Sequence, residues 1–138
     1  MNKKYLLLIN TTLQDKVVLA LARDDSLVSK IEVKTQFKHS ERLLPGIDKL
    51  LKKNKVALQE IKAIGVVRGP GSYTALKIGL TVANVLGFSL KIPIVGVKLS
   101  EFKDINDLAK IAYNRGIKVR GSEKIVLPFY GERPYYEK

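Results

Sequence analysis

The sequence predicts an α/β fold formed as a single lobe, with a mixed five-stranded sheet covered by helices. Five short apolar segments have the character of strands, three longer segments have the character of helices, and the last two strand-like segments are each followed by a helix. A strand–helix–strand step needs a crossover connection, which makes the two strands parallel and places them in an α/β layer. The 138 residues are enough for one domain with a modest core.

The first three predicted strands form the antiparallel part of this sheet. Residues 5–10 are a continuous apolar run, which is typical of a buried strand. Residues 16–23 and 27–34 follow, and the turn-forming residues 24–26 between them indicate a hairpin. The third strand alternates between mostly apolar and polar residues, so we expect one of its faces to be exposed.

A helix is predicted from Ser40 to Lys53, because leucine and isoleucine recur there at helical spacing. Pro45 fits best in the first turn of this helix, or marks a kink. Residues 56–60 are expected to form a short helical turn, and residues 62–67 a fourth strand.

The second predicted helix runs from about Tyr73 to Leu90 and is apolar on nearly all sides. A fifth strand at 92–97 and an amphipathic helix at 99–115 follow, with Ser100 as the expected N-cap. We therefore divide the chain into a lobe over residues 1–115 and a basic link with a C-terminal tail over residues 116–138.

The composition limits the function. The chain has 25 Lys and Arg against 13 Asp and Glu, a net charge of +12, which favours acidic partners such as RNA. The absence of cysteine excludes a disulfide framework, a zinc–thiolate site and a cysteine nucleophile. The apolar run at 5–9 is too short for a signal peptide, and no uninterrupted run reaches membrane-spanning length. We therefore expect a cytoplasmic protein that does not bind membranes.

The stretch "GPGS" at residues 69–72 has two interpretations. It is not a P-loop, because the required Gly-Lys-Ser/Thr ending is missing around Lys77. The first interpretation is a hinge, in which the glycines allow unusual backbone angles and the serine caps the helix. The second is a phosphate site at the helix N-terminus, where free N–H groups bind anions. Its residues would be Gly69, Gly71, Ser72 and Thr74.

The helix after this loop is predicted to meet a second polypeptide. Ala75, Gly79, Ala83 and Gly87 are spaced by four and form a small-sided ladder that another backbone can approach closely. Glycine in a helix costs about 1 kcal/mol relative to alanine, so these glycines need a packing reason. The ladder packs either on the chain's own sheet or on a partner, and in the first case the opposite apolar side remains to be covered: Ile78, Val82, Val85 and Leu86. The predicted partner-facing residues are Leu43, Leu44, Ile47, Leu51, Ala75, Gly79 and Ala83.

Four segments resemble the TsaB (YeaZ) family. "RGPGSYTALKIGLTVANVLGFSLKIPIVGVKLSEF" is similar to the family's glycine-rich signature with its following helix and strand. "HSERLLPGIDKLLKKN" resembles the family's first helix, and "LLLINTTLQDKVVLALARDD" its opening hairpin. The tail "VLPFYGERPYYEK" resembles the family's closing motif. The resemblance covers most of the chain.

The resemblance implies an actin-like and Hsp70-like (ribonuclease H-like) lobe. It also implies a non-catalytic scaffold role in making the threonylcarbamoyl-adenosine (t6A) modification of tRNA. The implied partners are a catalytic TsaD-type paralogue, which pairs with TsaB through helices, and a TsaE-type ATPase. The chain departs from the family where the usual aspartate is Asn10, a glycine is Ala75 and an arginine is Lys77, and where most of a second lobe is missing. We therefore expect no enzymatic activity, no cofactor and no metal.

Two other functions remain open from the residues. The first is a basic module that binds tRNA, with tyrosines stacking on unpaired bases. The second is a lone-lobe nucleotide binder that uses the "GPGS" loop. Self-dimerisation also remains open beside pairing with the paralogue. The cations expected to contact RNA are Lys110, Arg115, Lys118, Arg120 and Lys124.

Overall fold

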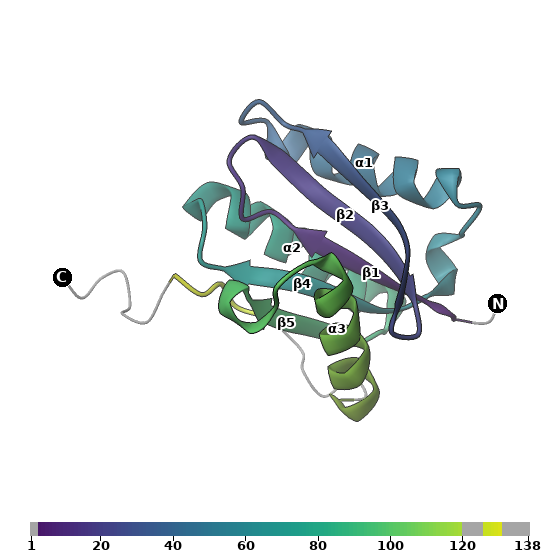
Figure 1. The fold of residues 1–138 in the computed structure, drawn as a ribbon. Helices are drawn as coiled ribbons and strands as arrows, with labels where there is room; N and C mark the ends of the chain where they lie inside the picture. Colours follow the sequence, from purple (N-terminus) through teal and green to yellow (C-terminus); the bar gives the residue numbers. More distant parts are fainter. Residues whose placement is uncertain (1–2, 120–125, 131–138) are drawn as a thin grey trace.

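The fold is described from a computed structural model, which describes residues 3–119 and 126–130 (Figure 1). These residues contain three helices, five strands and two short 3-10 turns, at Leu58–Glu60 and Leu99–Glu101. The elements are β1 (Tyr5–Asn10), β2 (Lys16–Arg23), β3 (Ser26–Lys34), α1 (His39–Lys53), β4 (Ile61–Gly69), α2 (Tyr73–Leu90), β5 (Ile94–Lys98) and α3 (Ile105–Val119).

The strands form one mixed sheet in the order β3-β2-β1-β4-β5. The pairs β1–β2 and β2–β3 are antiparallel, whereas β1–β4 and β4–β5 are parallel. Central strand β1 is buried along its middle, with Leu7, Leu8 and Ile9 fully inaccessible. The predicted mixed five-stranded α/β sheet is confirmed, and each strand lies within two residues of its predicted bounds.

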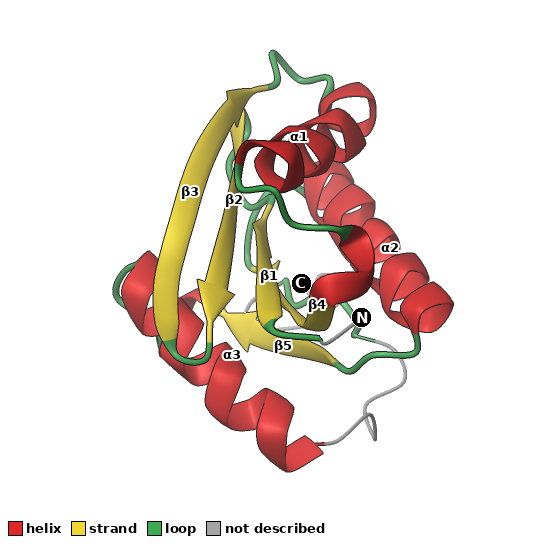
Figure 2. Ribbon diagram, turned by 90° about the vertical axis from the view of Figure 1, so that its right-hand side faces the viewer, coloured by secondary structure: helices red, strands yellow, loops and turns green. Residues whose placement is uncertain are grey.

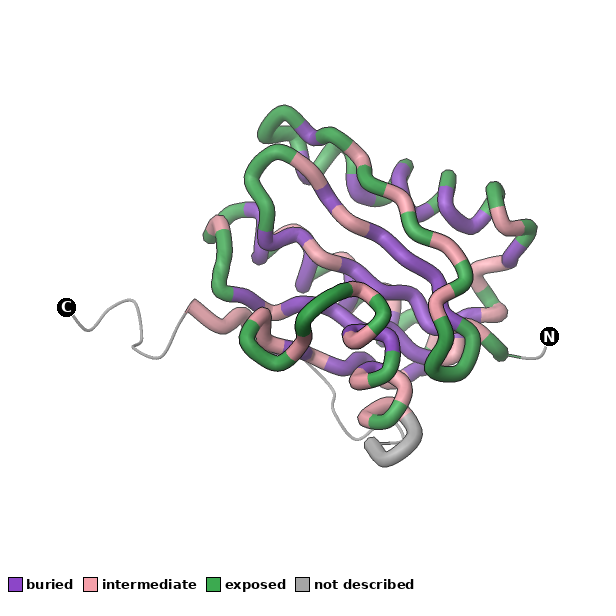
Figure 3. The backbone as a smooth tube through the Cα atoms, viewed as in Figure 1, coloured by how far each residue is buried: buried purple, intermediate pink, exposed green. Residues whose placement is uncertain are grey.

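Helices α1 and α2 cover one face of the sheet and α3 covers the other (Figure 2). Because successive side chains of a strand point to opposite faces, Leu7 and Ile9 pack beneath α1 and α2, whereas Leu6 and Leu8 pack against α3. Gly65 in β4 allows α3 to approach closely, since a Cβ there would lie 2.8 Å from the Cβ of Ala112. Figure 3 shows the buried positions concentrated in the central strands.

The predicted N-cap of α3 and the placement of Pro45 in the first turn of α1 are wrong, whereas a kink at Pro45 stays a prediction. Helix α3 begins at Ile105, because Asp104 caps it by accepting a hydrogen bond from the backbone N–H of Asp107 (2.8 Å). Ser100 instead lies in the preceding 3-10 turn and is exposed. Pro45 lies inside α1, well past its first turn, where it removes one backbone hydrogen bond of the helix.

Helix α2 is long and apolar enough to cross a membrane, with a mean hydropathy of 1.3 over its 18 residues, of which 33% are buried. Lys77 interrupts the apolar run in this helix, so the expectation that no uninterrupted apolar run reaches this length is not contradicted. Core helices meet the same criteria, and α2 places its small side against the sheet. The length and hydropathy of α2 are therefore weak evidence for a membrane span.

Part of the C-terminal tail packs on the lobe itself. Val126 is 1% exposed and joins the core between the sheet and α2. The backbone N–H of Phe129 donates to the carbonyl oxygen of Arg68 in β4 (2.7 Å). Residues 126–130 therefore lie beside the ends of β4 and β5 (Figure 1). The predicted basic link begins at residue 116, but α3 continues to Val119. Residues 120–125 and 131–138 of the predicted link and tail lie outside the described residues.

Candidate protein–protein interface

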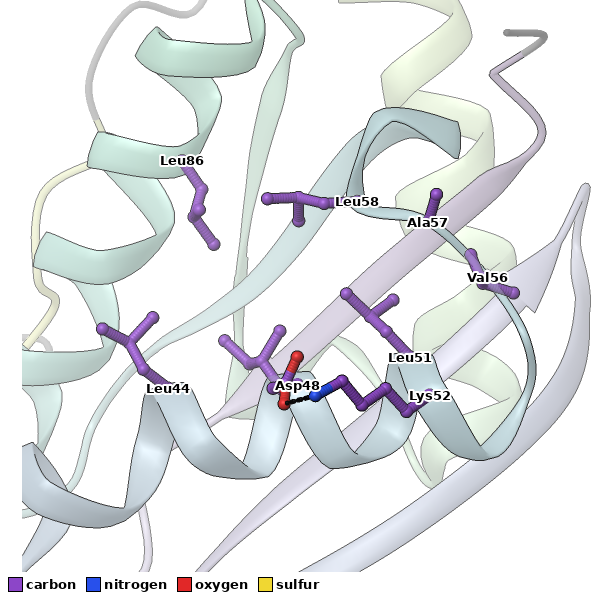
Figure 4. A pocket seen from close by; sticks show the side chains of 9 residues that line it. Leu44, Asp48, Leu51, Lys52, Val56, Ala57, Leu58 and Leu86 are labelled. Atoms are coloured by element: carbon purple, nitrogen blue, oxygen red, sulfur yellow. Dashed lines mark ion pairs between the residues drawn. The ribbon is translucent and has the colours of Figure 1, made fainter.

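A hollow runs along the seam between α1 and α2 (Figure 4). Apolar side chains of both helices and of the segment after α1 line it, and the ion pair between Asp48 and Lys52 (2.9 Å) lies at its rim. A second hollow lies farther toward the N-terminus of both helices. The first hollow is lined by Leu44, Ile47, Asp48, Leu51, Lys52, Val56, Ala57, Leu58 and Leu86, and the second by Ser40, Lys77, Ile78, Thr81 and Val82.

The outer side of α2 extends these hollows into a continuous apolar strip. Residues three or four apart are neighbours on a helix surface, so Val85 adjoins both Val82 and Phe88. Val85 is 57% exposed and Phe88 is 86% exposed. Across the seam, Leu44 of α1 is 53% exposed. We call the following residues the α1–α2 face: Leu44, Ile78, Val82, Val85, Leu86 and Phe88.

Six of the seven predicted partner-facing residues are buried in the chain's own core. The ladder of α2 packs on the sheet, and Gly79 is required because a Cβ there would overlap the Thr11 side chain. Ile47 and Leu51 form only the floor of the first hollow. The buried six are Leu43, Ile47, Leu51, Ala75, Gly79 and Ala83, and Leu44 alone is exposed.

Helix α2 still has a side available to a partner, but it is the side opposite the ladder. The sequence could not decide whether the ladder or the opposite apolar side meets the sheet. In the structure, Ile78, Val82 and Leu86 are half-buried and Val85 is exposed. The side that the sequence left to be covered is therefore the one that remains open.

The "GPGS" loop is filled by the chain itself. Gly69 has φ +123°, and a Cβ there would overlap the carbonyl oxygen of Phe129. A Cβ at Gly71 would lie 2.7 Å from the carbonyl oxygen of Thr12. Both glycines thus serve close approaches within the protein, but only Gly69 has the unusual backbone angle that the hinge interpretation expects. Ser72 occupies the N-cap position of α2, but its hydroxyl makes no capping hydrogen bond, which corrects that expectation, and Thr74 is exposed.

Asn10, at the carboxyl end of β1, makes local hydrogen bonds. Its side-chain oxygen accepts from the backbone N–H (3.0 Å) and from the hydroxyl (2.7 Å) of Thr12. An amide carries no charge to face a metal-bound phosphate. Within residues 3–119 and 126–130, no group of three or more His, Asp or Glu residues could hold a metal ion.

His39 is the first residue of α1, one residue before the predicted start of this helix, and its side chain makes a structural contact. It is 5% exposed, and its Nε2 donates to the carbonyl oxygen of Leu13 (2.9 Å). This bond fastens the start of α1 to the loop between β1 and β2.

The cations predicted to contact RNA do not form one described patch. Arg115 donates to the carbonyl oxygen of Gly96 (3.0 Å) and pairs with Glu101, so it links α3 to β5 and the following turn. Lys110 is exposed on α3. The side chain of Lys118, and residues Arg120 and Lys124, lie outside what the structure describes.

Comparisons with known proteins place the chain among proteins named for a tRNA modification. The model of the family TsaD, described as tRNA N6-adenosine threonylcarbamoyltransferase, matches residues 33–102, half of the chain. The TsaB protein of Bacillus subtilis, named a tRNA threonylcarbamoyladenosine biosynthesis protein, is 39% identical over 83 residues. That match covers 60% of this chain and 36% of the relative. A tRNA N6-adenosine threonylcarbamoyltransferase of Syntrophotalea carbinolica is 45% identical over 60 residues, which are 44% of this chain and 18% of the relative.

The fold has a solved counterpart in YeaZ from Pseudomonas aeruginosa, with a TM-score of 0.63 and 30% sequence identity. The match covers 69% of this chain and 44% of the YeaZ chain. The chain thus spans less than half the length of each of these three relatives. Its mixed five-stranded α/β lobe therefore shares the fold of the matched part of that YeaZ chain. The chain belongs to the family described by the TsaD model, and within it to the TsaB (YeaZ) proteins.

Proposed function

We propose that the chain is a non-catalytic scaffold subunit in the cytoplasmic system that makes the threonylcarbamoyl-adenosine modification of tRNA. Its α1–α2 face docks a TsaD-type paralogue. The observation that carries this proposal is the exposure of Val85 and Phe88 next to an apolar seam, in a family whose relatives are named for this modification. Exposed apolar strips of this kind mark surfaces that another protein covers.

The face has the composition of a docking site. Phe88 is an exposed aromatic anchor, and Leu44 and Leu86 line the hollow that a partner side chain would fill. The floor of the first hollow is fixed by Ile47 and Leu51, which belong to the core. A partner therefore meets a preformed surface, which lowers the entropy that binding must overcome.

The absence of catalysis is supported by two features of the lobe. The glycines of the "GPGS" loop lie against the backbone of Phe129 and Thr12, and Asn10 offers no carboxylate. We expect the purified chain neither to hydrolyse ATP nor to transfer a carbamoyl group, and to act through the paralogue together with a TsaE-type ATPase.

The test is association followed by modification. The chain is mixed with the TsaD-type paralogue of the same host and the mass of the complex is measured by light scattering. The t6A content of tRNA is then measured in a strain that lacks the chain. A one-to-one complex and a loss of t6A support the proposal. A chain that forms only a dimer with itself, or unchanged t6A in the depleted strain, overturns it.

A further inference from the structure

A cluster of aromatic and basic side chains lies where the "GPGS" loop, the end of β5 and the tail meet. The rings of Tyr73 and Tyr130 stack with centroids 5.2 Å apart and planes 19° apart. Lys77 places its ammonium group 5.0 Å from the centre of the Tyr73 ring, and Lys98 places its own 4.2 Å from the centre of the Phe129 ring. We call these five residues the aromatic–basic cluster.

Three separate segments build this cluster. Tyr73 and Lys77 come from the first turns of α2, Lys98 ends β5, and the other two rings come from the tail. Arg68 of β4 holds the tail by two hydrogen bonds. Its side-chain Nε donates to the carbonyl oxygen of Leu127 (3.0 Å), and its own carbonyl oxygen accepts from the backbone N–H of Phe129 (2.7 Å). The backbone that carries the tail's rings is thus held to the lobe.

The cluster is at the surface and carries net positive charge. Tyr73 is 47% exposed, Lys77 is exposed, and Lys98 is half-buried. Glu101 is the nearby acid, but its carboxylate pairs with Arg115. Within the described residues Lys77 forms no ion pair with a carboxylate. Its ammonium group therefore has no acidic partner there.

We propose that the aromatic–basic cluster binds a single-stranded segment of RNA. Flat rings offer stacking surfaces to unpaired bases, and lysines beside them bind the phosphates that link those bases. The net charge of +12 attracts such a polyanion from any direction, whereas the rings select unpaired bases. An acidic peptide has few flat rings to stack, and a duplex hides the faces of its bases. This inference goes beyond the scaffold role, because the site lies in this chain alone and needs no paralogue.

The first experiment measures RNA affinity against salt concentration. A fluorescent unstructured RNA of about 10 nucleotides is titrated with the purified chain, and a duplex of the same length is the comparison. The double variant Lys77→Gln/Lys98→Gln should bind the single strand more weakly. The plot of log association constant against log salt concentration should become less steep by about 1.4, which corresponds to the loss of two phosphate contacts. The matched control is Lys30→Gln/Lys34→Gln, which removes the same charge from β3 at the opposite edge of the sheet. The control should change the slope much less.

The second experiment isolates the rings. Tyr73→Leu keeps the charge of the cluster, so it should weaken single-strand binding by about tenfold while leaving the salt slope unchanged. Hydrogen exchange of the Phe129 amide shows whether the tail stays attached in each variant. Equal weakening by the two lysine pairs overturns the proposal, since it would mean diffuse attraction to a basic protein. Duplex binding as tight as single-strand binding, or no binding by the unaltered chain, also overturns it. None of these results bears on association with the paralogue.

Discussion

The side chain of Asn84 and the backbone of Val126 form two reciprocal hydrogen bonds. The Asn84 amide nitrogen donates to the carbonyl oxygen of Val126 (3.0 Å), and the backbone N–H of Val126 donates to the Asn84 amide oxygen (2.9 Å). The side chain of Val126 is buried and packs over Gly96, where a Cβ would lie 2.6 Å from Val126 Cγ1. Asn84 of helix α2 thus helps to hold the C-terminal segment on the lobe, together with the hydrogen bonds that Arg68 of β4 makes to the same segment.

Replacing Asn84 should release this segment. Asn84→Ala removes both bonds and leaves two backbone groups of Val126 without partners, which costs about 1–3 kcal/mol. The free energy of unfolding is measured by denaturant titration, and the attachment of the tail by hydrogen exchange at Val126 and Phe129. Asn114→Ala, at an exposed position of α3, is the control and should not destabilise the protein. Unchanged exchange in the Asn84 variant would show that the burial of Val126 and the hydrogen bonds to Arg68 hold the segment without Asn84.

Gly79 should tolerate no side chain, in contrast to Gly116. A Cβ at Gly79 would overlap Thr11, so Gly79→Ala should destabilise the chain by about 1–3 kcal/mol. A Cβ at Gly116 in α3 would lie 3.5 Å from Ala63, an ordinary contact, so Gly116→Ala should stabilise by about 0.5–1 kcal/mol through helix propensity. Thermal unfolding of both variants checks this pair. If Gly79→Ala lost affinity for the partner but kept its stability, the ladder of α2 would have to contact the partner, contrary to this account.

The ion pair between Glu101 and Arg115 should make stability depend on pH. Its hydrogen bond with Arg115 holds the pKa of the Glu101 carboxyl below its ordinary value of 4.5, against the opposing effect of burial. Because the folded pKa is lowered, the stabilisation is complete above pH 4.5 and is lost as the pH falls through the lowered pKa.

At pH 7 the free energy of unfolding of the Glu101→Gln variant should therefore be about 0.5–1 kcal/mol lower than that of the unaltered chain. The difference in free energy of unfolding between the variant and the unaltered chain should shrink as the pH falls below the ordinary carboxyl pKa of 4.5. In an Arg115→Gln background the same change should have little effect, which isolates the pair by a double-mutant cycle. A constant difference across this pH range would assign the effect to something other than the carboxylate charge.

The strands and the order of elements could be predicted from the sequence because their signals are local. Each strand is a short apolar run between turn residues, and the crossover helices dictate which strands are parallel. The start of α3 could not be predicted, since Ser100 and Asp104 are both good N-cap residues. Only the hydrogen bond from Asp107 decides between them.

The side of α2 that meets the sheet depends on contacts between distant residues. The sequence shows a helix apolar on nearly all sides, and the choice is made by the space that Thr11 leaves for Gly79. The position of the tail likewise depends on Asn84 meeting Val126, 42 residues away. No periodicity encodes such pairs, which explains why most of the partner-facing residues predicted from the sequence are buried in the core.

The central claim is that the exposed α1–α2 face docks the TsaD-type paralogue. The most direct test compares Val85→Glu with Val28→Glu. Both valines are exposed, at 57% and 48%, but Val28 lies on β3. Both variants should keep the stability of the unaltered chain. The dissociation constant for the paralogue, measured by titration calorimetry, should rise at least about tenfold for Val85→Glu and stay unchanged for Val28→Glu. Equal affinity of the two variants would contradict the account.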